Sequence, residues 1–505
     1  MISRMDSGGE SVAERLSSQP PTLAHRPPDA ADCPLHRLPN EILTLIFRFC
    51  VASQSGMPNQ FFHDTSKAPW VITHICHRWR AAAHRTPSLW TTIRLSVDAL
   101  EEPMRSRPEV TELLSSYLER SHPLPISITI MSEDGFPAHI LGPIVATCER
   151  WHDLFIFIHP DDLPRIAVIR GRLPALQALQ IIPTRLGQTN APPTMFEVAP
   201  RLDTLTLGGH ALELGFALPW SQIRSFEANY IDPAHVLRAL PRMPELIDLK
   251  LGREPPEHAP GAIEGLMITP THVRTLTLNV VEGQRSPGHP GDLLEHLTLP
   301  ALTDLEVECD VEESIESIRR LVERSDCRIE ALTLVVTFSC SGNLKGLFGL
   351  LPHLRRLTLF DGSSMTDGPL LDALVVRPED PGSVLLPKME HITLLASTPL
   401  QEHEVQRWLD VFESRVEPQQ PQDSDGEDDG ARQVHALRSI LMGCTSGENI
   451  VDNRLCLDRF NVIRVSGVMV DLCGWGIGTS LAAGADNEVS NALTLHATHT
   501  ESAAR

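Results

Sequence analysis

Only two groups of residues in this chain have types and spacings that suggest chemistry. The first is His74, Cys76 and His77, which offer metal-ligating side chains close together. A structural zinc site needs a further ligand pair at matched spacing, and the sequence supplies none. We therefore interpret the three as packing and surface residues of a helix, with Cys76 and Trp79 on its apolar side, and expect no metal.

The second group is the G-x-G-x-G run of Gly474, Gly476 and Gly478. Thr479 stands where a dinucleotide-binding fingerprint has its last glycine, and no strand–helix–strand unit follows. The sequence also lacks the motifs G-x-x-x-x-G-K-[ST], H-E-x-x-H and G-x-S-x-G. We therefore predict that the protein is not an enzyme and has no cofactor. The alternative of an enzyme rests only on the unassigned C-terminal residues 445–505.

The elements that could present a binding surface are repeated strands. Eleven fragments share the pattern apolar-x-x-apolar-x-apolar. They begin at Trp151, Leu176, Leu202, Ile223, Leu246, Val273, Leu302, Ile329, Leu354, Met389 and Leu437. From Trp151 to Leu354 the fragments are 21 to 29 residues apart, which is the spacing of leucine-rich repeats. One such unit cannot bury its apolar face alone, so stacking of the units is expected to form a continuous core.

The segments between these strands include helical patterns, such as residues 232–243 and 311–326. An amphipathic helix is also predicted over 108–120, followed by a strand with Ile126, Ile128 and Ile130 on one face. The last two steps of the repeat are longer, and the second contains the acidic run 422–430. The repeats lack the regular asparagine of the strict consensus, so their curvature is left open. A generic α/β protein with strand-like fragments is the alternative.

Residues between the apolar positions of each strand point to the opposite face. One column of such residues reads Gln180, Thr206, Glu227, Lys250, Thr277, Glu306, Thr333, Thr358 and Thr393. Threonine is simply a good strand residue, so most of the column needs no functional explanation. Glu227, Lys250 and Glu306, with Arg355 and Arg356 nearby, are the candidates for contact with a protein substrate.

The N-terminal region has a different pattern. Residues 1–34 are polar and rich in proline, which is typical of a disordered arm. A helix is then predicted from apolar residues at helical spacing, namely Leu38, Ile42, Leu45, Ile46 and Phe49. After a loop over 54–68, a second helix that ends at Pro87 has one apolar face, made of Ile72, Ile75, Trp79 and Ala82 or Ala83.

Residues 35–95 resemble the F-box family in its divergent fungal form. The resemblance is carried by LPNEILTLIF at 38–47 and by VITHICHRWRAAAHRTPSLWTTIRL at 71–95. It implies a small helical F-box module, which the repeat region would follow as an irregular leucine-rich-repeat solenoid, in an α/β chain. It also implies a Skp-type adaptor partner, a cullin scaffold and ubiquitin transfer by a separate enzyme. The matching residues, expected to bind the adaptor, are Leu38, Pro39, Glu41, Ile42, Ile46 and Phe47.

Residue types alone favour a local core for this set, whereas the resemblance favours an interface for Leu38 and Pro39. The function expected is that of a substrate-recognition adaptor of a Skp–cullin–F-box ubiquitin ligase, with an unknown protein substrate. The alternative is a non-catalytic repeat scaffold for protein–protein interaction without ubiquitin transfer.

The charge, the cysteine content and the hydropathy of the chain bear on other kinds of partner and on its compartment. The chain has 505 residues and a net charge of −22, which argues against a nucleic-acid partner. Its 10 cysteines form no C-x-x-C pair, as expected of a reduced cytoplasmic or nuclear compartment. The apolar run 461–485 is interrupted by Arg464 and Asp471 and diluted by glycine, so we expect no membrane-spanning helix.

The resulting domain plan has six parts. They are the arm 1–34, the F-box module 35–95, a connecting helix and strand 96–150, the repeat array 151–412, an acidic linker 413–435, and 436–505, which holds the last repeat-like strand and a tail.

Overall fold

The structure is a computed structural model with two compact units. It describes residues 37–55, 61–100, 108–185, 192–252, 266–278, 290–309, 312–336, 341–360, 368–377, 384–396, 400–416, 434–444 and 454–474. The first unit, called the helical unit here, consists of the described residues up to Trp90 except 61–63. The second, called the array, consists of 61–63 and the described residues from Thr91 onward.

The helical unit contains α1 (Asn40–Ser55), α2 (Trp70–Ile75), α3 (His77–His84) and a short 3₁₀ turn, η4 (Pro87–Leu89). Leu43 and Phe47 lie one turn apart on α1, and both side chains are fully buried. The ring of Phe47 packs 5.0 Å from that of Trp79 on α3. Arg78 donates hydrogen bonds to the Leu38 carbonyl and to Asn40 Oδ1, which fixes α3 against the start of α1.

The single helix predicted to end at Pro87 is in fact two helices, because the backbone is extended at Cys76. The Cys76 sulfur accepts a hydrogen bond from the Trp79 backbone N–H at 3.4 Å and so caps the start of α3. This break changes which side chains share a face. Ile72 is buried as predicted, but Ile75 is 56% exposed.

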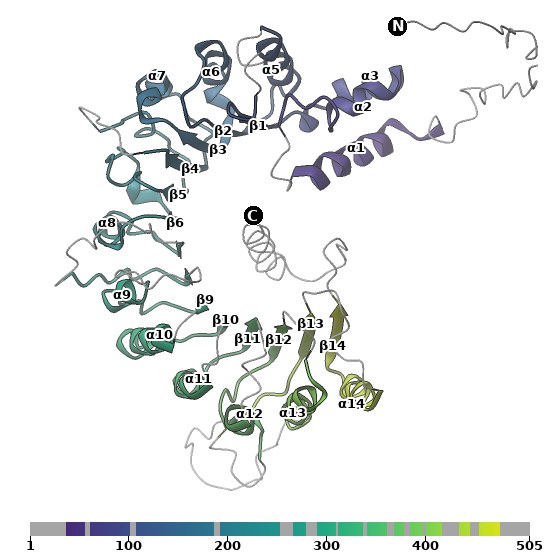
Figure 1. Ribbon diagram of the computed structural model, residues 1–505, viewed down its shortest axis with the longest axis vertical. Helices are drawn as coiled ribbons and strands as arrows, with labels where there is room; N and C mark the ends of the chain where they lie inside the picture. Colours follow the sequence, from purple (N-terminus) through teal and green to yellow (C-terminus); the bar gives the residue numbers. More distant parts are fainter. Residues whose placement is uncertain are drawn as a thin grey trace, which may run out of the picture. The chain divides into compact units, whose positions relative to one another are not determined.

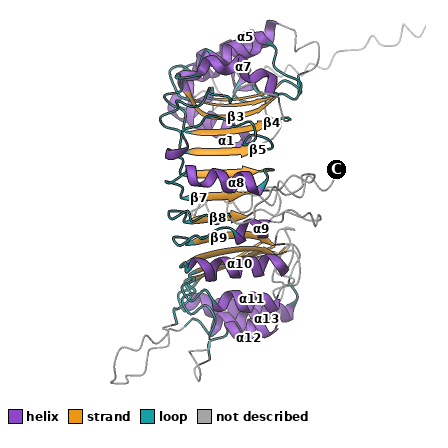
Figure 2. Cartoon of the chain, turned by 90° about the vertical axis from the view of Figure 1, so that its left-hand side faces the viewer, coloured by secondary structure: helices purple, strands orange, loops and turns teal. Residues whose placement is uncertain are grey.

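The array is built on one sheet of 14 parallel strands that follow each other in chain order (Figures 1 and 2). The strands are β1 (Thr92–Ser96), β2 (Ile126–Met131), β3 (Trp151–Ile158), β4 (Ala178–Pro183), β5 (Thr204–Gly208), β6 (Ser225–Asn229), β7 (Asp248–Leu251), β8 (Thr275–Leu278), β9 (Asp304–Cys309), β10 (Ala331–Val336), β11 (Arg356–Phe360), β12 (His391–Ala396), β13 (Ser439–Cys444) and β14 (Met469–Gly474). All eleven predicted fragments are confirmed as strands, β3 to β13.

Where the segments between the strands form helices, these helices lie along one face of the sheet (Figure 1). The α-helices are α5 (Pro108–Arg120), α6 (Ala138–Val145), α7 (Leu163–Ile166), α8 (Pro233–Ala239), α9 (Pro290–Glu295), α10 (Glu312–Ser325), α11 (Ser341–Gly349), α12 (Gly368–Leu374), α13 (Glu402–Glu413) and α14 (Arg454–Val465). The predicted helices at 108–120, 232–243 and 311–326 correspond to α5, α8 and α10. Asp232 caps α8 by accepting from Ala234 N–H at 2.8 Å, and Pro233 takes its first position.

The core of the array lies between the sheet and these helices. Strands pair so that equivalent apolar residues stand in line, as Leu305, Leu332 and Leu357 do across β9, β10 and β11. Each of these side chains is at most 2% exposed. On α10, Ile315, Ile318, Leu321 and Val322 are buried against them at helical spacing. The core is therefore continuous from unit to unit, as the repeat spacing predicted.

The repeat sheet extends beyond the predicted array at both ends. The segment from Trp90 to Leu95 has the repeat pattern, and β1 joins the sheet, so residues 91–95 and the segment 96–150 belong to the array. At the other end, α14 and β14 add a further unit in register with β13. The repeat pattern did not predict β14, because Gly467, with φ +94°, occupies the first position, where the other fragments have an apolar residue. Residues 1–34 and the acidic run 422–430 lie outside the described residues.

Within the described ranges, no helix combines the length and the apolar character needed to cross a bilayer. Part of the apolar run at 461–485 forms the end of α14 and β14 instead.

A buried arginine joins α12, α13 and the loop between them. Arg415 is 1% exposed and donates to the backbone carbonyls of Leu374, Leu385 and Leu386 at 2.7–2.9 Å. Burial lowers the pKa of Arg415 to about 10, so the guanidinium stays charged at neutral pH. Because its planar donors bond three carbonyls together, backbone dipoles stabilise the buried charge.

Phe47→Ala is expected to lower the local unfolding free energy of the helical unit by about 3–5 kcal/mol, because it leaves a cavity against Trp79. Phe49→Ala is the matched control on the same helix, since Phe49 is 74% exposed. Hydrogen exchange of α1 and α3 in the full chain measures both. Equal effects of the two variants would contradict this assignment of the core.

Arg415→Met is expected to destabilise α12 and α13 by at least about 3 kcal/mol, because several buried carbonyls lose their donors. Hydrogen exchange of α12 and α13 reports the change locally, since repeat arrays need not unfold in one step. Arg407→Met removes an exposed charge from α13, two turns before Arg415, and should change the exchange much less.

Candidate functional site

The sheet face opposite the helices carries the column of residues that the sequence singled out. Successive strands place these residues in register, from Gln180 on β4 to Thr393 on β12. Register also extends the column to Arg94, Thr129 and Phe155 at one end, and to Leu441 and Asp471 at the other. We call this surface the open face. The prediction that these side chains share one face is confirmed.

Charged residues occupy the middle of the open face. Glu227, Lys250, Thr277 and Glu306 are register partners across four consecutive strands, β6 to β9. Glu227 accepts hydrogen bonds from Asn229 Nδ2 at 2.6 Å and from Thr206 Oγ1 at 3.4 Å. The candidates Glu227, Lys250 and Glu306 are thus brought together as a mixed-charge row.

Glu306 is the most perturbed member of this row. Burial raises the pKa of its carboxyl group, while the charge of Lys250 and a hydrogen bond from Thr277 Oγ1 at 3.4 Å oppose the rise. The net pKa lies above the ordinary value. The fold therefore keeps a carboxylate on the open face where its ionised form is disfavoured.

The two arginine candidates have separate positions. Arg356 lies on the open face and donates to Asp304, two strands away, at 2.9 Å. Arg355 instead lies just before β11, with its guanidinium 4.0 Å from the carboxylate of Glu390. Burial raises the pKa of Glu390, but the His435 hydrogen bond and the charges of Arg438 and Arg355 outweigh it and lower the pKa overall. Arg355 thus belongs to a structural ion cluster away from the charged row.

The predicted adaptor-binding residues divide into surface and core. Pro39, just before α1, and Glu41 and Ile42 on it are exposed, whereas Leu38 and Ile46 are half-buried. Phe47 is fully buried beneath them, so its side chain belongs to the core of the helical unit and not to its surface. Phe47 was predicted to be a surface residue because it matches the motif, although its spacing of four residues from Leu43 indicates that both lie on the buried side of α1.

Two further apolar residues of α1 are exposed that the adaptor set did not include. Ile42, Leu45 and Phe49 are 42%, 48% and 74% exposed, and their spacing aligns them along one side of the helix. We call them the α1 stripe. The helical periodicity had already grouped these residues, but it indicated packing.

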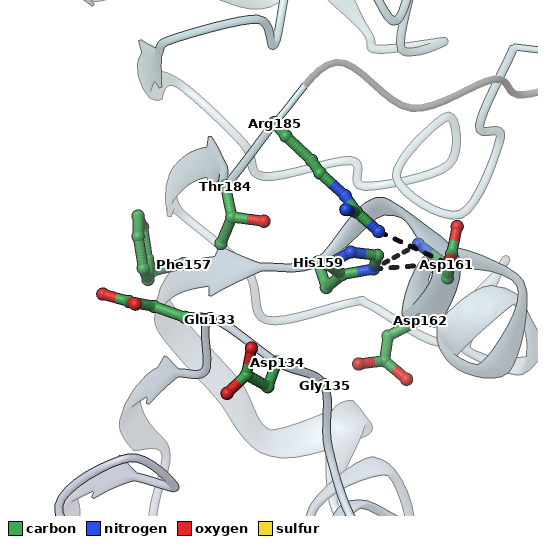
Figure 3. Close-up of a pocket in the computed structure, with 9 residues that line it drawn as sticks. All are labelled: Glu133, Asp134, Gly135, Phe157, His159, Asp161, Asp162, Thr184 and Arg185. Atoms are coloured by element: carbon green, nitrogen blue, oxygen red, sulfur yellow. Dashed lines mark hydrogen bonds and ion pairs between the residues drawn. The ribbon is translucent and has the colours of Figure 1, made fainter.

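A cavity of about 710 Å³ lies at the C-terminal ends of β2, β3 and β4 and was not predicted from the sequence (Figure 3). We call it the strand-end cavity. Its lining residues are Glu133, Asp134, Gly135, Phe157, His159, Asp161, Asp162, Thr184 and Arg185. The only signal in the sequence is that acidic pairs, 133–134 and 161–162, follow two successive strands.

The floor of the strand-end cavity is held by a buried carboxylate. Asp162 is 5% exposed, accepts from Phe136 N–H at 2.8 Å and pairs with Arg165. Gly135 permits this close approach, because it has φ +107° and a Cβ there would lie 3.2 Å from Asp162 Oδ2. On the rim, Asp161 lies 3.6 Å from His159 and 3.9 Å from Arg185.

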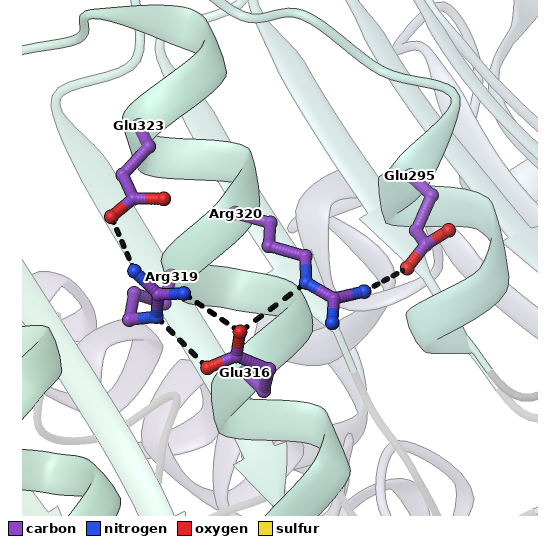
Figure 4. Close-up of polar contacts among 5 residues, drawn as sticks. All are labelled: Glu295, Glu316, Arg319, Arg320 and Glu323. Carbon is purple, nitrogen blue, oxygen red and sulfur yellow. Dashed lines mark hydrogen bonds and ion pairs between the residues drawn. The ribbon is translucent and has the colours of Figure 1, made fainter.

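A further polar cluster lies on the helices. No group of three or more His, Cys, Asp or Glu side chains in the described ranges is placed to hold a metal ion. On α10, Glu316 pairs with Arg319 at 2.8 Å and Arg320 at 3.3 Å, and Arg320 reaches Glu295 of α9 at 2.8 Å (Figure 4). The Arg319 hydrogen bond is the main cause that lowers the pKa of Glu316 to about 2. This network connects neighbouring helices on the face opposite the open face.

The chain was compared with known proteins by sequence and by structure. No protein-family model matches the sequence, and no curated protein matches it. Among solved structures, the chain is similar to a protein in a crystal structure of a TLR13–ssRNA13 complex, with 13% sequence identity and a TM-score of 0.32. The match covers 63% of this chain and only 39% of that chain. At that TM-score the likeness carries no argument about function.

Glu306→Gln is expected to increase the free energy of unfolding at neutral pH. Folding raises the pKa of Glu306, so the wild-type residue contributes its full stability below the ordinary value of 4.5 and loses it as the pH rises through the folded-state pKa. The uncharged glutamine avoids that loss. Hydrogen exchange of β9 across a pH series should show a difference that disappears in acid, and a difference independent of pH would contradict the assignment.

Proposed function

We propose that this chain is a non-catalytic, cytoplasmic or nuclear substrate receptor of a Skp–cullin–F-box ubiquitin ligase. In this proposal the helical unit is the F-box and docks a Skp-type adaptor. The array is an irregular leucine-rich-repeat solenoid whose open face holds a protein substrate. Ubiquitin transfer is then performed by other components of the complex, so the chain needs no catalytic residue, cofactor or metal.

The α1 stripe is the observation that carries this proposal. A helix that packs only within its own unit directs its apolar residues inward, as Leu43 and Phe47 do. The exposure of Ile42, Leu45 and Phe49 on the same helix leaves apolar area that a partner groove would remove from water. The residues that resemble the F-box motif surround this stripe, with Leu38 and Pro39 at the helix entrance.

The array supports the second half of the proposal. Parallel strands present one residue each to a common column, so a bound segment would meet the same positions strand after strand. The row of Glu227, Lys250 and Glu306 provides charges of both signs there. The net charge of −22 favours a protein partner over a nucleic acid.

The alternative is a repeat scaffold that binds proteins without ubiquitin transfer. It uses the same open face and differs only in the role of the helical unit. Ubiquitinated clients that disappear when the α1 stripe is altered would favour the receptor.

The first experiment is capture of a purified Skp-type adaptor by the full chain. Ile42→Glu/Leu45→Glu places two charges on the α1 stripe without touching the buried Leu43 and Phe47. The variant is expected to weaken adaptor binding at least tenfold, to order of magnitude, because charges then meet an apolar groove.

A matched control makes the same change elsewhere. Val462→Glu/Val465→Glu alters two exposed apolar residues of α14, which are 64% and 88% exposed. It should bind the adaptor like the wild-type chain. Absence of binding by the wild-type chain would remove the ubiquitin-ligase assignment and leave the scaffold.

A further inference from the structure

The strand-end cavity has an excess of acceptor groups over cations. Glu133 and Asp134 line it and are exposed, and within the described part of the chain neither forms an ion pair. Arg185 and His159 both lie toward Asp161 on the opposite rim, at 3.9 and 3.6 Å. Two carboxylates therefore remain available to a cationic group that enters from solvent.

Other lining atoms also favour such a group. Phe157 is half-buried in the wall, where its aromatic face can contact a cation. Thr184 Oγ1 is a buried oxygen without a hydrogen-bond partner among the described residues. The described residues offer no cluster placed to hold a metal ion, and about 710 Å³ is the size of a cavity for an organic group.

The open face continues from this cavity as an apolar strip. Phe157 stands in register with Met131 on β2 and Ile182 on β4, and Phe155 lies two residues earlier on the same side of β3. All four side chains are only half-buried. Gly208 on β5 leaves room for Ile182, since a Cβ at that position would lie 2.9 Å from Ile182 Cγ1.

We propose that the strand-end cavity and this strip bind an extended segment of a partner protein in which a lysine or arginine neighbours an apolar residue. The cationic side chain enters the cavity among Glu133, Asp134 and Phe157, with charge-assisted hydrogen bonds to the carboxylates. The apolar neighbour covers the strip of Phe155, Met131 and Ile182. The inference rests on the proposed function, because it names the kind of segment that the array would present.

The test uses a fluorescein-labelled peptide of alternating lysine and leucine, titrated with the full chain and followed by fluorescence anisotropy. Glu133→Gln/Asp134→Asn is expected to weaken binding about tenfold, because it removes both unpaired acceptors. Phe157→Leu keeps the wall apolar but removes the aromatic face, and should weaken binding severalfold. A peptide in which serine replaces leucine should bind more weakly than the original.

The control distinguishes binding in the strand-end cavity from nonspecific attraction of the cationic peptide to the acidic chain. Glu112→Gln/Glu245→Gln removes two exposed carboxylates of the array that do not line the cavity, and should bind the peptide like wild type. Equal weakening in this control would overturn the proposal, as would displacement of the peptide by spermidine at comparable concentration. Failure of the wild-type chain to bind the peptide would also overturn it.

Adaptor capture separates this inference from the proposed function. The cavity variants leave the α1 stripe unchanged, so they should still capture the Skp-type adaptor. Peptide binding without adaptor capture would refute the ubiquitin-ligase assignment and leave the cavity standing, whereas adaptor capture without peptide binding would refute the cavity alone.

Discussion

The in-register pairing of parallel strands is the constraint on which the array depends. Each unit contributes two apolar residues from its strand to columns such as Leu305, Leu332 and Leu357, and none of these columns is buried unless the next strand aligns with it. Because side chains alternate along a strand, the same register that buries these columns also sets the order of residues on the open face. The core and the order of residues on the open face are thus consequences of one alignment.

Two charged groups, Arg415 and Glu306, are held at positions where burial disfavours their charge. Arg415 is a buried cation that takes its partners from backbone carbonyls, and it connects the residues just after α13 to the end of α12 and to the loop that follows α12. Glu306 is a carboxylate kept where burial disfavours its charge. The first arrangement stabilises the fold. The second does not, which makes Glu306 a better candidate for function than its threonine neighbours.

The three candidate surfaces differ in how far the residues alone predicted them. The column from Gln180 to Thr393 was correct because a period of two and a regular spacing leave one choice of face. On α1, the apolar spacing grouped Ile42, Leu45 and Phe49. It did not predict that these residues face solvent while Phe47 is buried. The strand-end cavity was missed, because its carboxylates come from different loops that only the pairing of β2, β3 and β4 brings together.

The sequence by itself determined the strands of β2 to β13, the helices α5, α8 and α10, and the face on which each strand residue lies. These depend on local periodicity and on repeat spacing, which are read directly from residue order. Only the tertiary structure decided that α2 and α3 are separate, that β14 extends the sheet, and which acidic groups surround a cavity. Those outcomes depend on a cap at Cys76, on pairing with a neighbouring strand where Gly467 interrupts the pattern, and on contacts between loops distant in sequence. Residue order alone does not specify them.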